Sequence, residues 1–280
     1  MANIYCASKA SISPRFSTTP TIYPRYGGGL LLLQAVDDIR STFFPNVAEA
    51  ISTGASSGLF SFKAEDGGET IRTNVENFLN KDARYRHATF VVDVEAMKDA
   101  NDFNRARESV LTKNRLRQMR MPSVAFPSGA SHVVCDEDSL RPASTTFLGK
   151  TDKPVSESVG QRREHGLEQK RGDFYHQQLR QLDPPPDLTF LNDKKFAKDF
   201  AAIASDKGQG NLDNKLAVLY LDGNAFGAKQ AACKTPGGLT AFDKQVKSLR
   251  RQFLLGLLQA VVAKTPTRRS HPSGNPALGG

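Results

Sequence analysis

The most apolar short run of the chain is followed directly by an acid and two glycines. The run covers residues 216–221, and behind it stand Asp222, Gly223, Asn224, Phe226 and Gly227. A strand with both faces covered reads as a continuous apolar run, so we expect Asp222 at the rim of a sheet. Magnesium there would find a carboxylate and nucleotide phosphate oxygens, the hard ligands it prefers. The two glycines would let the backbone approach the phosphates closely. Asp-Gly and Gly-Asn pairs are also ordinary turn formers, so a plain turn is the alternative interpretation.

Two further groups have the residue types for chemistry. His132 and Cys135 have the spacing of one zinc-ligand pair, with Asp138 close behind. A structural zinc site needs four ligands, and the others would have to come from His165, His176 or a distant cysteine, so a zinc site is not expected. Asp93 ends another apolar segment, but its flanks lack glycines that would admit a phosphate, so we interpret it as a structural strand-end acid or helix cap.

Composition limits the class of protein. The chain has 280 residues, of which 39% are hydrophobic and 24% are charged, as in a globular protein. No apolar run approaches the ~20 residues needed to cross a bilayer, and no membrane partner is expected. With three cysteines (Cys6, Cys135 and Cys233) an even disulfide framework is excluded, which favours the reducing cytoplasm.

A formal charge of +9 favours a phosphate-bearing partner, nucleotide or nucleic acid. Two segments concentrate the cations. The first has Arg105, Arg107, Lys113, Arg115, Arg117 and Arg120, with Glu108 as its only acid. The second has Lys244, Lys247, Arg250, Arg251, Lys264, Arg268 and Arg269. The alternative for each segment is the solvated face of a helix.

Hydrophobic periodicity predicts the elements that would position these residues. Strands are expected at 3–7, 56–63 and 87–95, and helices at 69–81, at 102–119 and after the glycines at 27–29. This alternation predicts an α+β fold with helices covering a sheet. Residues 121–190 are proline-rich and polar and read as an insert or connector. In the last part, residues 242, 246, 249, 253, 257 and 261 form a nearly continuous apolar stripe on a long helix.

The segment 216–227, LAVLYLDGNAFG, resembles the first strand and turn of a palm domain. The family is the large, polymerase-like subunit of type III CRISPR effector complexes, which is related to the GGDEF nucleotidyl cyclases. That subunit has a degenerate first palm, a cysteine-bearing insert and a second palm. Segments 27–39, 56–62 and 84–96 are similar to the first palm, 135–144 is similar to the insert, and 158–170 is similar to the segment behind the insert.

This resemblance implies two ferredoxin-like, palm-type units, each an antiparallel sheet with helices on one face. The first would span 1–120, the insert 121–190, and an incomplete second unit 191–280. Asp222 would hold magnesium or manganese, and Gly223, Asn224, Phe226 and Gly227 would line the phosphates of ATP. The basic helix would contact a guide RNA or another subunit of an antiviral effector complex.

The departures from the family decide what activity to expect. No Gly-Gly-Asp-Asp or Gly-Gly-Asp-Glu hairpin occurs, and the sequence ends at Gly280, where the family places it. With only Asp222 available, two-metal chemistry lacks its second carboxylate, so we expect this chain to be inactive or incomplete as a nucleotidyl cyclase or oligoadenylate synthase. Two alternatives are a non-enzymatic basic scaffold that binds RNA or protein, and an unrelated basic α/β protein.

Overall fold

The chain divides into two units, and each is described by itself. Unit 1 comprises residues 1–174 and 196–246, and unit 2 comprises residues 175–195 and 247–280. The computed structural model describes residues 2–8, 23–46, 50–54, 57–119, 133–137, 141–143, 154–171, 174–192, 200–204, 210–211, 213–217 and 224–264.

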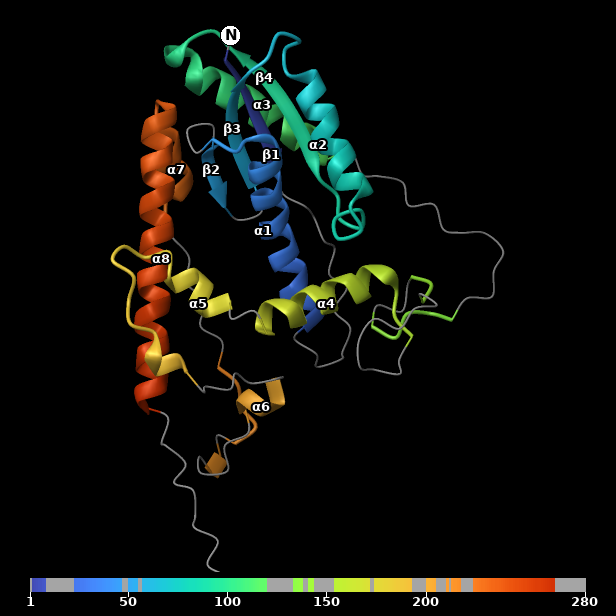
Figure 1. The fold of residues 1–280 in the computed structure, drawn as a ribbon, viewed down its shortest axis with the longest axis vertical. Coiled ribbons are helices and arrows are strands. Elements are labelled where there is room, and N and C mark those ends of the chain that lie inside the picture. The colour runs from blue at the N-terminus through green and yellow to red at the C-terminus, as the bar shows by residue number, and fades with distance from the viewer. Residues whose placement is uncertain are drawn as a thin grey trace, which may run out of the picture. The chain divides into compact units, whose positions relative to one another are not determined.

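Unit 1 contains a sheet built by interleaving two strand–helix–strand segments (Figure 1). Its elements in chain order are β1 (Ala2–Ser8), α1 (Tyr23–Phe43), β2 (Ala50–Gly54), β3 (Ser57–Lys63), α2 (Glu69–Lys81) and β4 (Val91–Met97). The order across the sheet is β2-β3-β1-β4, and each neighbouring pair is antiparallel. This is the split βαβ arrangement, and it confirms an α+β fold with an antiparallel sheet.

The local sequence explains most of these boundaries. In β3 the apolar residues alternate, so Phe60 and Phe62 point to one face and Leu59 to the other. Before α2 the chain turns at Gly68, whose φ of 90° suits glycine, and Asp66 accepts hydrogen bonds from the backbone N–H groups of Gly68 and Thr70 at 2.9 and 2.7 Å. The predicted strand at 56–63 and helix at 69–81 are confirmed.

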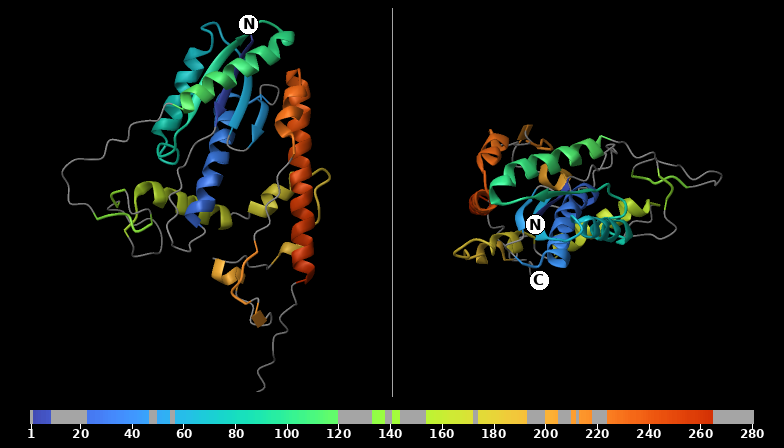
Figure 2. Two further views of the ribbon diagram at one scale, coloured as in Figure 1. Left: turned by 180° about the vertical axis from the view of Figure 1, so that it is seen from behind. Right: turned by 90° about the horizontal axis from the view of Figure 1, so that it is seen from above.

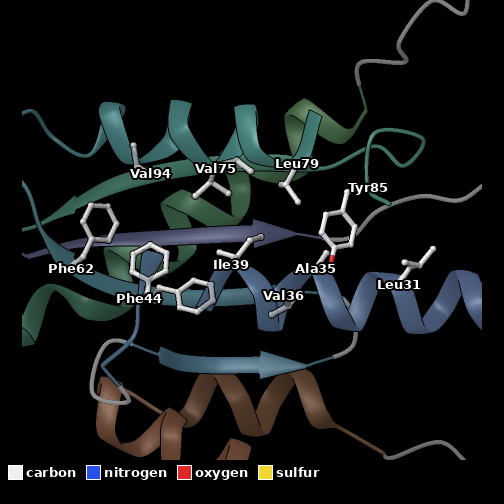
Figure 3. Packing of buried hydrophobic residues seen from close by; sticks show 12 residues of the cluster. Leu31, Ala35, Val36, Ile39, Phe44, Phe62, Val75, Leu79, Tyr85 and Val94 are labelled. Carbon is white, nitrogen blue, oxygen red and sulfur yellow. The ribbon is translucent and has the colours of Figure 1, made fainter. Parts of the chain in front are cut away.

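The main core lies between the sheet and the pair α1 and α2. Figure 3 shows Val75 and Leu79 of α2 pointing toward Ile39 and Ala35 of α1, with the Tyr85 ring beside them. The predicted stripe on residues 69–81 is therefore the buried face of α2. The rings of Phe44 and Phe60 stack with centroids 4.6 Å apart, which adds attraction beyond the area they bury.

The opposite face of the sheet is also covered. A short 3-10 turn (Ala100–Asp102) leads into α3 (Phe103–Gln118), which lies along this face of the sheet (Figure 2). Its residues Phe103, Ala106 and Val110 pack with Leu59 and Met97. The expectation of helices on one face is therefore wrong for this sheet. The reason is the pleat: β4 places Val92 and Val94 toward α1 and α2, and Asp93, Glu95 and Met97 toward α3.

Part of the predicted insert packs within unit 1. The helix α4 (Glu157–Arg171) crosses α1 at Gly27. A side chain cannot fit there, since a Cβ on Gly27 would lie 1.8 Å from the Arg162 carbonyl oxygen. Glu157 at the start of α4 forms an ion pair with Arg86, and its carboxylate lies 3.4 Å from the Nε2 atom of His87. Gly27 thus serves close helix packing inside α1.

The remaining elements are helices. They are α5 (Phe174–Leu179), the 3-10 turn Thr189–Leu191, α6 (Phe200–Ala204), α7 (Phe226–Ala232) and α8 (Pro236–Lys264). Of the strand predicted at 216–221, residues 216 and 217 are not in a strand, and 218–221 lie outside the described residues. The described residues of 191–280 therefore leave the second palm-type sheet untested.

Unit 2 is held together by leucines. Leu179, Leu182, Leu188 and Leu191 pack against the C-terminal half of α8. The α8 residues in this contact are Leu254, Leu255, Leu258 and Val262. None of these residues belongs to the apolar stripe predicted from the sequence. The stripe residues in this half of the helix are Leu249, Phe253, Leu257 and Val261, and they are 46–56% exposed. This half of α8 therefore has two apolar faces. The spacing of apolar residues in the sequence predicted burial of the face that is exposed in unit 2.

Candidate nucleotide-binding turn

The predicted metal ligand, Asp222, and its neighbour Gly223 lie outside the described residues. The rest of the turn leads into α7. Asn224 precedes the helix, Ala225 adopts a left-handed φ of 59°, and Phe226 and Gly227 begin the helix. All four residues are exposed. Among the residues that the structure describes, none lies within 4 Å of a Cβ built on Gly227, so they leave open space beside this backbone.

The far end of α7 is fastened to α3 by a buried arginine. Arg107 is 5% exposed, and its guanidinium donates to the carbonyl oxygens of Gln230 at 2.8 Å and Cys233 at 3.5 Å. These carbonyls belong to the end of α7, where the helix dipole is negative and carbonyl groups lack helical partners. A second contact of Arg107, at 2.8 Å, is the carboxylate of Glu108.

The first turns of α8, which follows α7 in the chain, are hydrogen-bonded to β2 of the sheet. Thr240 donates to the carbonyl oxygen of Ile51 at 3.1 Å, and Ser52 donates to the Asp243 carboxylate at 3.0 Å. The Phe226 ring lies 5.9 Å from the ring of Phe242 in an edge-on arrangement. The helices on the C-terminal side of the predicted turn are therefore fixed to unit 1. Arg107 holds the end of α7, and Thr240 and Asp243 hold the start of α8.

The sequence grouped Arg107 with the cations of a phosphate-binding or solvated helix face, and either position would expose it, but Arg107 is buried. A usable signal was present: Phe103, Arg107 and Val110 follow the i, i+4, i+7 spacing of one helix face. That spacing places the arginine among apolar residues facing the core. Buried arginines are expected to have fixed partners, and here the partners are two backbone carbonyls and the Glu108 carboxylate.

Asp93, the acid at the end of the earlier apolar segment, is a buried strut. It is 6% exposed and accepts a hydrogen bond from Arg117 at 2.9 Å. Arg117 also donates to the Val92 carbonyl at 2.6 Å and pairs with Glu76 at 3.0 Å, which links α3 to α2 around the outer strand β4. Among the residues that the structure describes, the second oxygen of Asp93 is buried with no hydrogen-bond partner. The contacts of Asp93 are structural, as expected, but the predicted position at a strand end or helix cap is wrong, because Asp93 lies inside β4.

Two other cations of α3 are also paired. Arg105 contacts Asp102 at 2.6 Å, and Lys113 contacts Glu95 at 2.7 Å. Burial acts to raise the pKa of Glu95, but hydrogen bonds from Lys113 and Ser109 outweigh it and lower the pKa. Hydrogen bonds from Arg105 and the backbone of Lys98 lower the pKa of Asp102 to about 2. Of the six basic residues, Arg115 is exposed and Arg120 lies outside the described residues.

The residues considered for zinc are not brought together. Cys135 is buried with Val155 and Val159. Burial lowers the pKa of His165, whose Nε2 atom has no hydrogen-bond partner. His132 and Asp138 lie outside the described residues, and His176 belongs to unit 2. Among the residues that the structure describes, no group of three or more His, Cys, Asp or Glu side chains could hold a metal ion.

Comparison with known proteins adds no family. No protein-family model matches the chain, and no curated protein shows significant similarity to it. Within the described ranges, no helix is both long and apolar enough to span a bilayer.

Proposed function

We propose that this chain is a palm-type, nucleotide-binding protein of a type III CRISPR antiviral system. The observation that carries the proposal is the sheet of unit 1. Its strand–helix–strand–strand–helix–strand order and its β2-β3-β1-β4 arrangement have ferredoxin-like topology, as the resemblance to a first palm requires. A fold alone does not identify a function, so the proposal also relies on the 222–227 turn.

In this proposal Asp222 binds magnesium or manganese, which in turn neutralises the phosphates of ATP. Gly223, Asn224, Phe226 and Gly227 shape the turn against those phosphates. The open space beside Gly227 supports a close approach of the backbone to a ligand. The sequence offers Asp222 without the family's hairpin acids, so the proposal is nucleotide binding in the cytoplasm by a chain that is inactive or incomplete as a nucleotidyl cyclase or oligoadenylate synthase.

The test is nucleotide binding by the full chain, measured by calorimetry with ATP in the presence of magnesium or manganese. Asp222→Ala should weaken binding by about tenfold or more, because the metal bridge is lost. Glu164→Ala, which removes an exposed carboxylate on α4, is the matched control and should bind like the parent. Equal binding by Asp222→Ala would overturn the metal site. Oligonucleotide synthesis from ATP would overturn the proposed inactivity.

A second candidate is a basic scaffold that binds RNA or protein without a nucleotide site. The supporting observation is α8, whose residues 244–264 include five cations and no acid. On α3, the residue we propose for contact with a guide RNA is Arg115, because Arg105, Arg107, Lys113 and Arg117 have partners inside the fold. RNA binding that is strong, salt-dependent and unchanged in Asp222→Ala would favour this scaffold.

A further inference from the structure

The C-terminal half of α8 exposes an apolar strip. Leu249, Phe253 and Leu257 are 56%, 55% and 46% exposed. They are four residues apart, so their side chains lie above one another on one helix face. The opposite face is already occupied by the leucines of unit 2. Large apolar side chains that are scattered singly on a surface need no explanation, but an ordered row marks a docking surface.

The strip is shaped to admit a helix. Gly256 and Ala260 lie on the same side of α8 as Phe253 and are exposed. Of the residues described by the structure, none lies within 4 Å of a Cβ built on Gly256, so none of them fills the notch beside Phe253. Rows of side chains four residues apart form the ridges that pack into grooves of another helix. A small residue beside such a ridge lets a partner approach closely.

The charges around the strip select the partner. Between residues 244 and 264 the helix carries Lys244, Lys247, Arg250, Arg251 and Lys264, and no Asp or Glu. Arg250 is exposed and stands three residues before Phe253, at the border of the strip. A second copy of α8 would set cations against cations, which is unfavourable. A partner with carboxylates at the border of its apolar face is complementary.

We propose that the strip formed by Leu249, Phe253 and Leu257 docks an amphipathic helix of a partner protein, whose apolar face is bordered by Asp or Glu. The apolar contacts supply affinity, and a carboxylate that meets Arg250 supplies orientation and association rate. The strip shares no residue with the 222–227 turn, and the inference does not depend on nucleotide binding.

The experiment uses the full chain and a synthetic helical peptide with leucines along one face and glutamates beside them. The control peptide has lysine at every glutamate position. The glutamate peptide should bind, measured by fluorescence anisotropy, and Phe253→Asp should weaken it by about 30-fold or more. Gln259→Asp introduces the same charge at an exposed position outside the strip, so its binding should stay near that of the parent. Circular dichroism and urea midpoints establish that both variants are folded.

Three outcomes would overturn the proposal. One is equal binding of the glutamate and lysine peptides, or binding that Phe253→Asp leaves unchanged. Another is a dimer of the parent chain that Phe253→Asp dissociates in sedimentation velocity, because a second copy would then cover the strip. The last is co-sedimentation with anionic lipid vesicles that depends on Phe253, with no binding of the glutamate peptide.

Discussion

The helices α3 and α8 are both rich in arginine and lysine, yet their cations meet different surroundings. The acids that pair with Arg117 and Lys113 of α3 come from other elements, namely Glu76 on α2 and Asp93 and Glu95 on β4. The C-terminal half of α8 packs on leucines and has no acid of its own. A run of basic residues therefore has no fixed meaning, because its role depends on the elements packed beside it.

The two helices also contribute to stability in different ways. On α3 the charges are part of the fold: Arg117, Asn114 and Lys113 donate to the backbone carbonyls of Val92, Val91 and Val94. Those contacts cover the outer strand β4, which would otherwise present hydrogen-bonding groups to another chain. On α8 the apolar face holds unit 2 together, and Arg250 stands exposed at the border of the strip.

The strongest test of this contrast is Arg117→Met. The change leaves the buried Asp93 carboxylate without its cation and should lower the free energy of unfolding by about 3 kcal/mol. Urea denaturation measures it. Adding Asp93→Asn to Arg117→Met should recover part of the loss, since the uncompensated charge is then gone. A loss below about 0.5 kcal/mol would show that the pair behaves like an exposed one.

A smaller loss is expected from Arg107→Met. The carbonyls of Gln230 and Cys233 would lose a charged donor, at a cost of about 2 kcal/mol. Amide hydrogen exchange in residues 226–232 should speed up, because the end of α7 is released from α3. Arg105→Met is the matched control, and as an exposed ion pair its loss should cost less than about 1 kcal/mol. Unchanged exchange in α7 would refute the anchoring role.

Acid should weaken α3 selectively. The pKa values of Glu95 and Asp102 are lowered in the folded state, so the stability they contribute is present above the ordinary carboxylate range. It is lost as pH falls from about 4 toward 2, where the folded protein takes up the protons. The urea midpoint should fall over this window, and Glu95→Gln should reduce the slope. A pH-independent midpoint would contradict the pairing.

The smallest effect is expected on α8. Arg250→Gln removes an exposed cation and should change the free energy of unfolding by less than about 0.5 kcal/mol. The same urea titration as for Arg117→Met compares the two helices directly. A loss near that of Arg117→Met would mean that the charges of α8 also belong to the fold.

Local pattern was sufficient where one face of an element meets the core. The alternation in 56–63 and the helical spacing of Val75 and Leu79 predicted β3 and α2, and the boundaries of α3 were predicted in the same way. The short strand β2 was not predicted, because its sequence, AISTG, has little alternation. It forms by pairing with β3, and Thr240 of the distant helix α8 bonds to its Ile51 carbonyl.

The sequence by itself determined the α+β class and the helices and strands with a single apolar face, whereas the acid-and-glycine turn at 222–227 stays a prediction. Only the tertiary structure decided which face of α8 is buried, and that Arg107 and Arg117 serve the fold. The physical reason is that periodicity reports how many apolar positions share a face, whereas burial and ion pairing depend on which distant residues pack against it.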